Sequence, residues 1–272
     1  MKILDVNNLQ VDFKGKKKTS TLVGGVSFSV NKGECVCIVG ESGSGKTMTM
    51  KAIMGLLDHN FKITGSATLG EIDLLRATKE DLRKIRGKQM TMILQNPMVC
   101  FDSLYRIGYQ MKETFSEHTD WSIEQIHNAC IETLEKMQMP NPEEVLKKYP
   151  HQLSGGMLQR IMIGIALTLN PDILIADEPT TAIDSVTQHE IMKEFVRLKN
   201  EGVTMIFITH DLGVASMISD KVVVMNKGKI VDSGTFDDIK ENPKDEYTKQ
   251  LVLQKKAVTN AFKQKIGGVH ID

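Results

Sequence analysis

Hydrophobic residues along this chain follow two spacings, which predict strands and helices in alternation. Short apolar or alternating runs of strand length dominate the first third of the chain and return after residue 171. Elsewhere, apolar positions recur every three or four residues, as on one face of a helix. This alternation predicts an α/β architecture. The predicted strands are residues 3–13, 25–30, 34–39, 63–70, 89–95, 172–177 and 203–209, with a late hairpin over 221–234 that turns at 226–228.

The middle of the chain has a different pattern. From Asn96 to about Tyr149 the strand signal vanishes, and residues 122–137 carry apolar side chains at helical spacing. Ser122 and Gln125 form the pattern of a capping box at the start of this helix. We therefore expect a helical subdomain inserted into the α/β core. The expected division is a core of residues 1–95 and 161–250, a helical subdomain of 96–160 and a C-terminal tail of 251–272.

The sequence GESGSGKT, from Gly40 to Thr47, follows an apolar strand and precedes a helix-forming stretch. Its pattern is G-x-x-x-x-G-K-[ST], in which glycines let backbone amides approach phosphate oxygens. Lys46 then reaches the terminal phosphates, and Thr47 offers a hydroxyl to Mg²⁺. A plain glycine turn is the alternative, but the strand before and the helix after favour a phosphate loop, because a helix N-terminus attracts anions. The predicted loop residues are Gly40, Glu41, Ser42, Gly43, Ser44, Gly45, Lys46 and Thr47.

Composition excludes several classes of function. The 272 residues contain 34 basic and 34 acidic side chains, so no bulk charge favours nucleic acid. Apolar runs fall far short of the ~20 residues needed to cross a bilayer, and Met1 leads directly into a strand pattern without a signal peptide. We expect a protein made in the cytosol. The four cysteines lack the spacing of a zinc site, and buried, reduced thiols are expected for all four.

Polar residues stand at the ends of three buried strands. Asp177 and Glu178 close the strand 172–177, His210 follows the strand 203–209, and Gln95 closes the strand 89–95. The carboxyl ends of parallel strands lie side by side at a ligand crevice. Asp177 is then expected to face Mg²⁺ and Glu178 to polarise a water for attack on a γ-phosphate. A helix cap and a structural histidine are the simpler alternatives.

A second glycine pair precedes a long apolar helix. The sequence LSGGMLQR places Ser154, a natural N-cap residue, before Gly155 and Gly156. A capped helix is the simplest interpretation. Two glycines at a helix N-terminus also make a second anion site. A single nucleotide cannot obviously occupy both anion sites.

Together, the order of these motifs resembles that of the ATP-binding-cassette (ABC) ATPases. The resemblance spans residues 3 to 250. The motifs and residues that follow one another as in that family are GESGSGKT, Gln95, LSGGMLQR, ILIADE, TAID and His210. It implies a P-loop NTPase fold of ABC type: a mixed sheet core, an antiparallel β subdomain and an inserted helical subdomain. It also implies ATP and Mg²⁺ as ligands, with Thr47, Gln95 and Asp177 at the metal.

The resemblance further implies that two such subunits enclose two ATP molecules. Ser154, Gly155 and Gly156 would then serve the ATP held by the partner. Phe13 is a candidate to stack on adenine, and Asp184 is placed at the dimer seam. Met157 stands where the family commonly has Gln, so a polar contact to the partner's nucleotide is in doubt.

Three functions compete: the ATPase of a membrane transporter, an ABC ATPase of DNA repair, and an idle regulatory subunit. Ser154 follows Gly45 by only 109 residues, which leaves no room for the long coiled coils of the second class. An idle subunit is expected to lack Glu178 or His210. The transporter is therefore favoured, bound peripherally at the cytoplasmic face of the membrane.

The stretches QNPMVCFDS, LSGGMLQR and NPKDEYTKQL resemble the peptide/nickel branch of binding-protein-dependent importers. That branch implies a second, different ATPase chain, two permease subunits and an extracellular substrate-binding protein as partners, and no nucleic acid. Peptide members commonly carry a longer tail with cysteines for an iron–sulfur cluster, whereas this sequence has 21 residues after Leu251 and no cysteine after Cys130. Phe101 also resembles the nickel-type members, whereas Ser103 weakens the match. Nickel or a related transition metal, free or chelated, is therefore favoured over oligopeptides as cargo.

Overall fold

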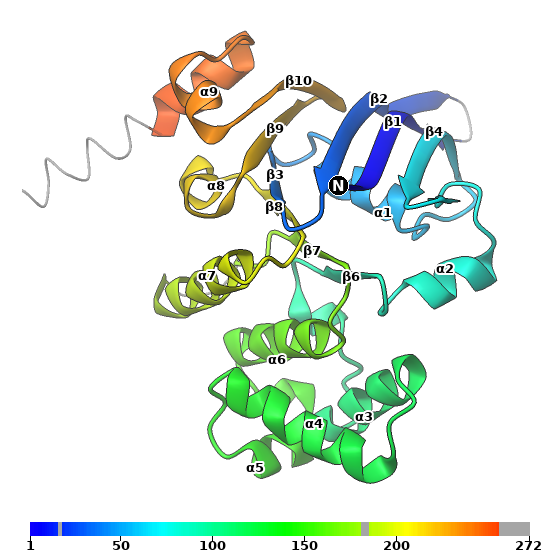
Figure 1. Ribbon diagram of the computed structural model, residues 1–272, viewed down its shortest axis with the longest axis vertical. Helices are drawn as coiled ribbons and strands as arrows, with labels where there is room; N and C mark the ends of the chain where they lie inside the picture. Colours follow the sequence, from blue (N-terminus) through cyan, green and yellow to red (C-terminus); the bar gives the residue numbers. More distant parts are fainter. Residues whose placement is uncertain (16–17, 181–184, 256–272) are drawn as a thin grey trace, which may run out of the picture. The chain divides into compact units, whose positions relative to one another are not determined.

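The computed structural model describes residues 1–15, 18–180 and 185–255, without the side chains of 185–187. Contacts divide the chain into two compact units. The first unit contains Met1–Arg76 and Ile206–Asp272, and the second contains Ala77–Met205. Figure 1 shows the helices and strands of both units, coloured along the sequence.

The first unit begins with an antiparallel sheet in the order β2-β1-β4-β5. Its long strands alternate between buried and exposed positions, because successive side chains of a strand point to opposite faces. In β1, the buried side chains include Leu4, Val6 and Leu9. Helix α1 contacts β1 and β2 (Figure 1). The bounds are β1 Lys2–Lys14, β2 Thr19–Asn31, α1 Lys46–Ile53, β4 Phe61–Leu69 and β5 Ile72–Asp73.

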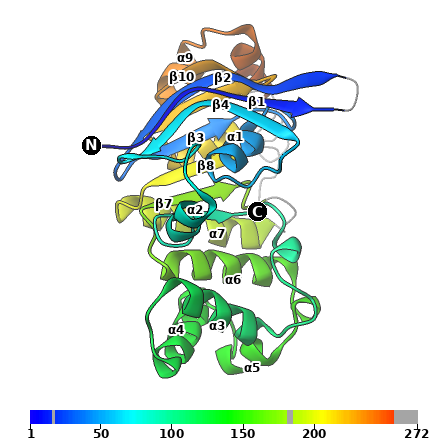
Figure 2. The ribbon, with the colours of Figure 1, turned by 90° about the vertical axis from the view of Figure 1, so that its right-hand side faces the viewer.

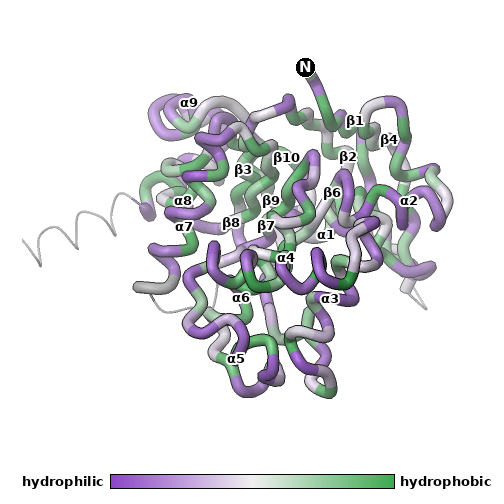
Figure 3. Tube along the Cα trace, turned by 60° about the horizontal axis from the view of Figure 1, so that its bottom comes forward, coloured by the Kyte–Doolittle hydropathy of each residue, from purple (hydrophilic) through white to green (hydrophobic). Residues whose placement is uncertain are grey.

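A second set of strands in the first unit follows the order β10-β9-β3-β8. Strands β3 and β9 pair in parallel, and β9 and β10 form the predicted hairpin. All five residues of β3 and of β8 are buried, and Figure 3 shows β3 and β9 as hydrophobic tubes. These elements are β3 Cys35–Val39, β8 Met205–Thr209, α8 Leu212–Ile218, β9 Lys221–Asn226, β10 Lys229–Gly234 and α9 Phe236–Glu241, followed by helical residues 246–255.

The second unit is mainly helical. Its two strands, β6 and β7, pair in parallel. Helix α4 contacts α6, and α3 contacts both α4 and α5; Figure 2 shows α6 lying along this cluster. The elements are α2 Lys79–Ile85, β6 Met90–Ile93, η1 Pro97–Val99, α3 Ile107–His118, α4 Ile123–Lys136, α5 Pro142–Lys147, η2 Pro150–Gln152, α6 Gly155–Thr168, β7 Ile173–Asp177 and α7 Ser185–Asn200.

These elements confirm the predicted fold class and most predicted strands. The capping box is also confirmed: Ser122 Oγ accepts from Gln125 N–H, and the Gln125 side chain accepts from Ser122 N–H. One expectation was wrong. Cys35, Cys37 and Cys130 are buried free thiols, but Cys100 is exposed. Cys100 ends the short η1 turn, in which none of the three residues is buried, so the thiol lies on an exposed turn.

No helix within the described ranges is both long enough and apolar enough to cross a bilayer.

The packing of α4 against α6 depends on a glycine. A Cβ on Gly164 would lie 2.7 Å from Thr133 Cγ2 and 2.8 Å from Met137 Cγ. Thr133 cannot easily rotate away, because its hydroxyl bonds Ala129 O at 2.6 Å and Thr168 Oγ1 at 2.7 Å. Alanine gains about 1 kcal/mol of helix propensity, whereas overpacking costs about 1–3 kcal/mol. We therefore expect Gly164→Ala to lower the free energy of unfolding by about 1 kcal/mol in urea titrations.

Gly155→Ala is the matched control, because it lies on the same helix and a Cβ there meets no atom within 4 Å. A Gly164→Ala protein as stable as this control would contradict the packing described.

Candidate functional site

The predicted phosphate loop connects β3 to α1, as the sequence requires. Two of its glycines are needed for stereochemical reasons. A Cβ on Gly40 would lie 2.2 Å from the carbonyl oxygen of Met225, so no other residue fits there. Gly45 precedes α1 with φ 102°, a backbone conformation that glycine adopts without a steric penalty. The chain can therefore turn tightly from a buried strand into a helix. The first backbone amides of this helix lie at the edge of the loop.

Lys46 lies inside this loop and not on the surface. Its side chain is 4% exposed, and its Nζ donates to Gly40 O at 2.7 Å and to Glu41 O at 2.9 Å. Removing an ammonium group from water is costly unless oxygen atoms surround it. The loop thus holds a positive charge among backbone carbonyls, where a phosphate would be a stronger partner.

Ser44 provides an independent test of whether the loop fits a phosphate. Its Oγ is buried and, among the described residues, has no hydrogen-bond partner. A buried hydroxyl without a partner costs roughly 1–3 kcal/mol. The loop therefore combines a buried cation, an unpaired hydroxyl and a helix N-terminus, a set of groups that fits the phosphates of a nucleotide.

Two other predicted site residues belong to the first unit. His210 is exposed immediately after β8, which confirms its predicted place at a strand end. Phe13, near the end of β1, is 38% exposed, and its ring centroid lies 5.3 Å from that of Phe61. An exposed ring on the sheet surface can stack on a nucleotide base.

In the second unit, the pairing of β6 with β7 brings Gln95 and Glu178 together. Ile93 pairs with Ala176 in a parallel register, and each site residue follows two positions later. Gln95 Nε2 accordingly donates to Glu178 Oε2 at 3.2 Å. Glu178 has a φ of 46°, which is uncommon for a residue with a Cβ and typical of strained functional positions. The amide thus orients the carboxylate.

Asp177 ends β7 and is 2% exposed. Ser154 caps α6 as predicted, since its Oγ accepts from Met157 N–H at 3.2 Å. Ser154 and Gly155 are exposed, whereas Gly156 is buried. Asp184 lies outside the described residues. The side chains expected at the metal, from Thr47, Gln95 and Asp177, all offer oxygen atoms, which are the ligands that Mg²⁺ prefers.

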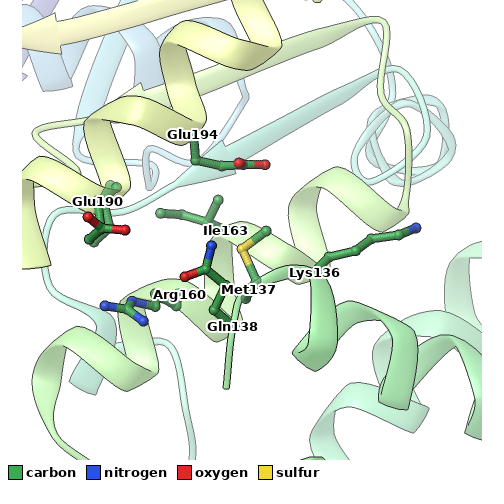
Figure 4. Close-up of a pocket in the computed structure, with 8 residues that line it drawn as sticks. Lys136, Met137, Gln138, Arg160, Ile163, Glu190 and Glu194 are labelled. Atoms are coloured by element: carbon green, nitrogen blue, oxygen red, sulfur yellow. The ribbon is translucent and has the colours of Figure 1, made fainter. Parts of the chain in front are cut away.

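Two cavities within the second unit lie away from these residues. One of about 40 Å³ lies between the end of α4, α6 and α7 (Figure 4), and a neighbouring one measures about 550 Å³. Glu190 and Glu194 face Arg160 and Ile163 across the smaller cavity (Figure 4). No predicted site residue lines either cavity, so neither is assigned to the nucleotide.

Sequence reasoning missed one residue at the phosphate loop. The Tyr247 hydroxyl accepts a hydrogen bond from Glu41 N–H at 2.8 Å, although 206 positions separate the two residues. Local patterns carry no information about such a contact. The only signal was the NPKDEYTKQL stretch, which we interpreted as a mark of family membership.

Comparisons with known proteins agree with this geometry. The family described as ABC transporter matches residues 23–181. The metal-staphylopine import system ATP-binding protein CntD of Staphylococcus aureus NCTC 8325 is 41% identical over 251 residues, which are 92% of this chain and 93% of CntD. The oligopeptide transport ATP-binding protein AppD of Bacillus subtilis 168 is 42% identical, covering 92% of this chain and 77% of AppD.

A solved structure of the ATP-binding cassette MJ0796, a dimer in a post-hydrolysis state with ADP and Pi, has a TM-score of 0.77. It is 26% identical and covers 86% of this chain and 98% of its own. The chain therefore belongs to the ABC transporter family. It is an ATP-binding, ATP-hydrolysing subunit of a transport system, as the sequence motifs predicted.

Proposed function

We propose that this chain hydrolyses ATP to drive a binding-protein-dependent importer at the cytoplasmic face of a membrane, with a transition metal such as nickel, free or chelated, as cargo. The observation that carries the ATPase assignment is Lys46, which is buried in a glycine loop and donates to the carbonyl oxygens of Gly40 and Glu41. The proposal of import draws on relatives that power import, such as CntD.

Each site residue has a proposed role toward ATP. The amides of residues 40–47 and the Lys46 ammonium hold the phosphates, and Phe13 stacks on the adenine. Glu178 accepts a proton from the attacking water, whose oxygen bonds to the γ-phosphorus as the bond to the β-phosphate oxygen breaks. Gln95 keeps the Glu178 carboxylate in place. His210 contacts the γ-phosphate.

The oxygen atoms of Thr47, Gln95 and Asp177 are proposed to hold Mg²⁺. Bound there, Mg²⁺ would neutralise charge that develops on the phosphate oxygens. Asp177 is nearly fully buried, and a buried carboxylate is stable only with a cation or hydrogen-bond donors beside it.

A second ATPase subunit, of a different chain, is the proposed partner at each nucleotide. The N-terminus of α6, with the exposed Ser154 and Gly155 and the buried Gly156, would bind the partner's ATP. Asp184 would lie at the seam between the subunits. Met157 offers no polar contact of the kind that Gln supplies in the family, so the N-terminus of α6 is the weaker half of a shared site.

An exposed apolar surface next to Gln95 is the proposed contact with a permease subunit. Soluble proteins rarely leave neighbouring large apolar side chains uncovered without a partner. Val99 and Leu104 are 72% and 78% exposed, and the rings of Tyr105 and Tyr109 stack at 4.9 Å. Because this surface begins at Val99, four positions after Gln95, movement at the nucleotide can reach the membrane subunits through it. A substrate-binding protein would deliver cargo to the permeases.

The choice of cargo rests on relatives and motifs, because no residue of this chain contacts cargo in the proposed assembly. CntD, whose name states metal-staphylopine import, is 41% identical. Oligopeptide importers are equally similar, since the AppD protein is 42% identical. Overall sequence identity therefore does not distinguish a metal from an oligopeptide as the cargo. The CFDS stretch, with Phe101, favours a metal, and oligopeptides are the alternative cargo.

Glu178→Gln tests the catalytic assignment. The amide keeps the size of the side chain and can still bond Gln95, but it cannot accept a proton. We expect ATP binding to be retained and hydrolysis to fall by about 10²-fold or more, the scale of a lost general base. Phosphate release and equilibrium ATP binding should be measured on the same preparation, at several protein concentrations, because the proposed site needs two subunits.

Glu201→Gln is the control, since Glu201 is an exposed carboxylate that pairs with Arg197 on the surface at 2.6 Å. Hydrolysis by Glu178→Gln at the rate of this control would show that another group acts as the base.

Deletion of the gene tests which cargo the transporter imports. We expect a fall in cellular nickel or cobalt under metal limitation, restored by the wild-type gene but not by the Glu178→Gln form. Sensitivity to a toxic oligopeptide should stay unchanged. Unchanged metal content together with acquired resistance to the peptide would replace the metal by oligopeptides as cargo.

A further inference from the structure

The helical residues 246–255 make two polar contacts with loops that carry proposed ATP ligands. Near the start of this helical segment, the Tyr247 hydroxyl accepts a hydrogen bond from Glu41 N–H at 2.8 Å. At its far end, Lys255 Nζ lies 2.6 Å from Asp211 Oδ1. These side chains are eight positions apart, a rise of about 12 Å along a helix, so one rigid element contacts both the phosphate loop and the loop that carries His210.

The first contact acts on Lys46 through a single peptide unit. Glu41 donates its N–H to Tyr247, and its carbonyl oxygen accepts from Lys46 Nζ at 2.9 Å. The same carbonyl accepts from Ser44 N–H at 3.1 Å. Tyr247 thereby fixes the residue around which the phosphate loop folds. Burial raises the pKa of Tyr247, so its hydroxyl stays neutral as a hydrogen-bonding group.

The second contact holds the residue next to His210. Asp211 caps α8, since its Oδ1 accepts from Gly213 N–H at 2.6 Å, and its own N–H donates to Thr209 Oγ1 at 3.0 Å. Burial alone would raise the pKa of Asp211, but Lys255 and the Gly213 amide outweigh it and hold the pKa below its usual value. The carboxylate is therefore charged and fixed, which restricts the backbone of His210.

The helical segment itself is well anchored in the first unit. Asp232, a buried residue of β10, accepts from Lys244 N–H at 2.7 Å. Asp245 Oδ1 accepts from Tyr247 N–H at 2.9 Å. Thr248 is fully buried and Val252 is 7% exposed. A segment fixed by packing and by hydrogen bonds can position the loops that it contacts.

We propose that residues 246–255 form a clamp in which Tyr247 and Lys255 are positioning residues, Tyr247 for the phosphate loop and Lys255 for the His210 loop. The clamp sets ATP affinity at one end and turnover at the other. This inference rests on the proposed roles of residues 40–47 and His210. It gives the C-terminal segment a function beyond packing: a protein or ligand that displaced this helix would lower both ATP binding and hydrolysis.

Tyr247→Phe and Lys255→Met test the two ends separately in the full chain. Tyr247→Phe keeps the ring but leaves Glu41 N–H without its acceptor, and we expect the dissociation constant for ATP to rise about three- to tenfold with kcat within about twofold. Lys255→Met should lower kcat about two- to fivefold with little change in ATP affinity. Hydrogen–deuterium exchange without nucleotide should become faster in residues 40–47 for the first variant and in 209–213 for the second.

Matched controls separate positioning from general stability. Tyr149→Phe removes a hydroxyl from a half-buried tyrosine in the other unit. Lys249→Met breaks the 2.5 Å pair with Glu246 on the same helical segment. Both should leave ATP affinity, kcat and exchange in the two loops unchanged.

If Tyr247→Phe and Lys255→Met behave like these controls in exchange and kinetics, the clamp is wrong while the ATPase assignment stands. A wild-type chain that binds no ATP would overturn the proposed function instead, and the exchange measurements without nucleotide would still decide whether the helix fixes the loops. If one of the two variants unfolds, the other variant still tests the clamp, because each variant removes one of its two contacts.

Discussion

The structure of the site depends on keeping a cation inside a glycine loop. Lys46 is almost fully buried and is bonded by two backbone carbonyls of the same loop. That arrangement requires a tight turn directly after a buried strand, and Gly40 permits it because a Cβ would collide with the Met225 carbonyl. It also requires the N-terminus of α1, where the helix dipole favours an anion. The loop therefore has the charge and the geometry that suit a phosphate, at the cost of a desolvated charge.

Other features of the chain support this loop from a distance in sequence. Gly228 N–H donates to Ser44 O at 2.9 Å, so the turn of the β9–β10 hairpin fixes the middle of the loop. The proposed clamp fixes its beginning through Tyr247. In the second unit, the parallel register of β6 and β7 brings Gln95 to Glu178. In the first two cases, an element that contributes no proposed ligand of its own holds the loop that does.

The sequence predicted the strands, the phosphate loop and the strand-end residues because each of these features is local. A run such as ILIAD is apolar over five positions, and the acids after it mark the end of a strand. Apart from the hairpin over 221–234, it could not predict which strands pair, so the hydrogen bond between Gln95 and Glu178 appeared only in the structure. Tyr247 was missed for the same reason, since its partner lies 206 positions away. The exposure of Cys100 was also missed, because a short turn of apolar residues resembles a buried segment in sequence.

Lys46 is the residue on which ATP binding is proposed to depend, and one equilibrium measurement tests its role directly. Calorimetric titration of the full chain with ATP and Mg²⁺ should give one site per chain, and Lys46→Ala should abolish binding while the protein keeps the circular dichroism spectrum of the wild type. Lys51→Ala, which removes a lysine from the same helix outside the loop, should bind as the wild type does. Unchanged affinity in a folded Lys46→Ala protein would contradict the account, because the buried cation would then have no part in holding the phosphates.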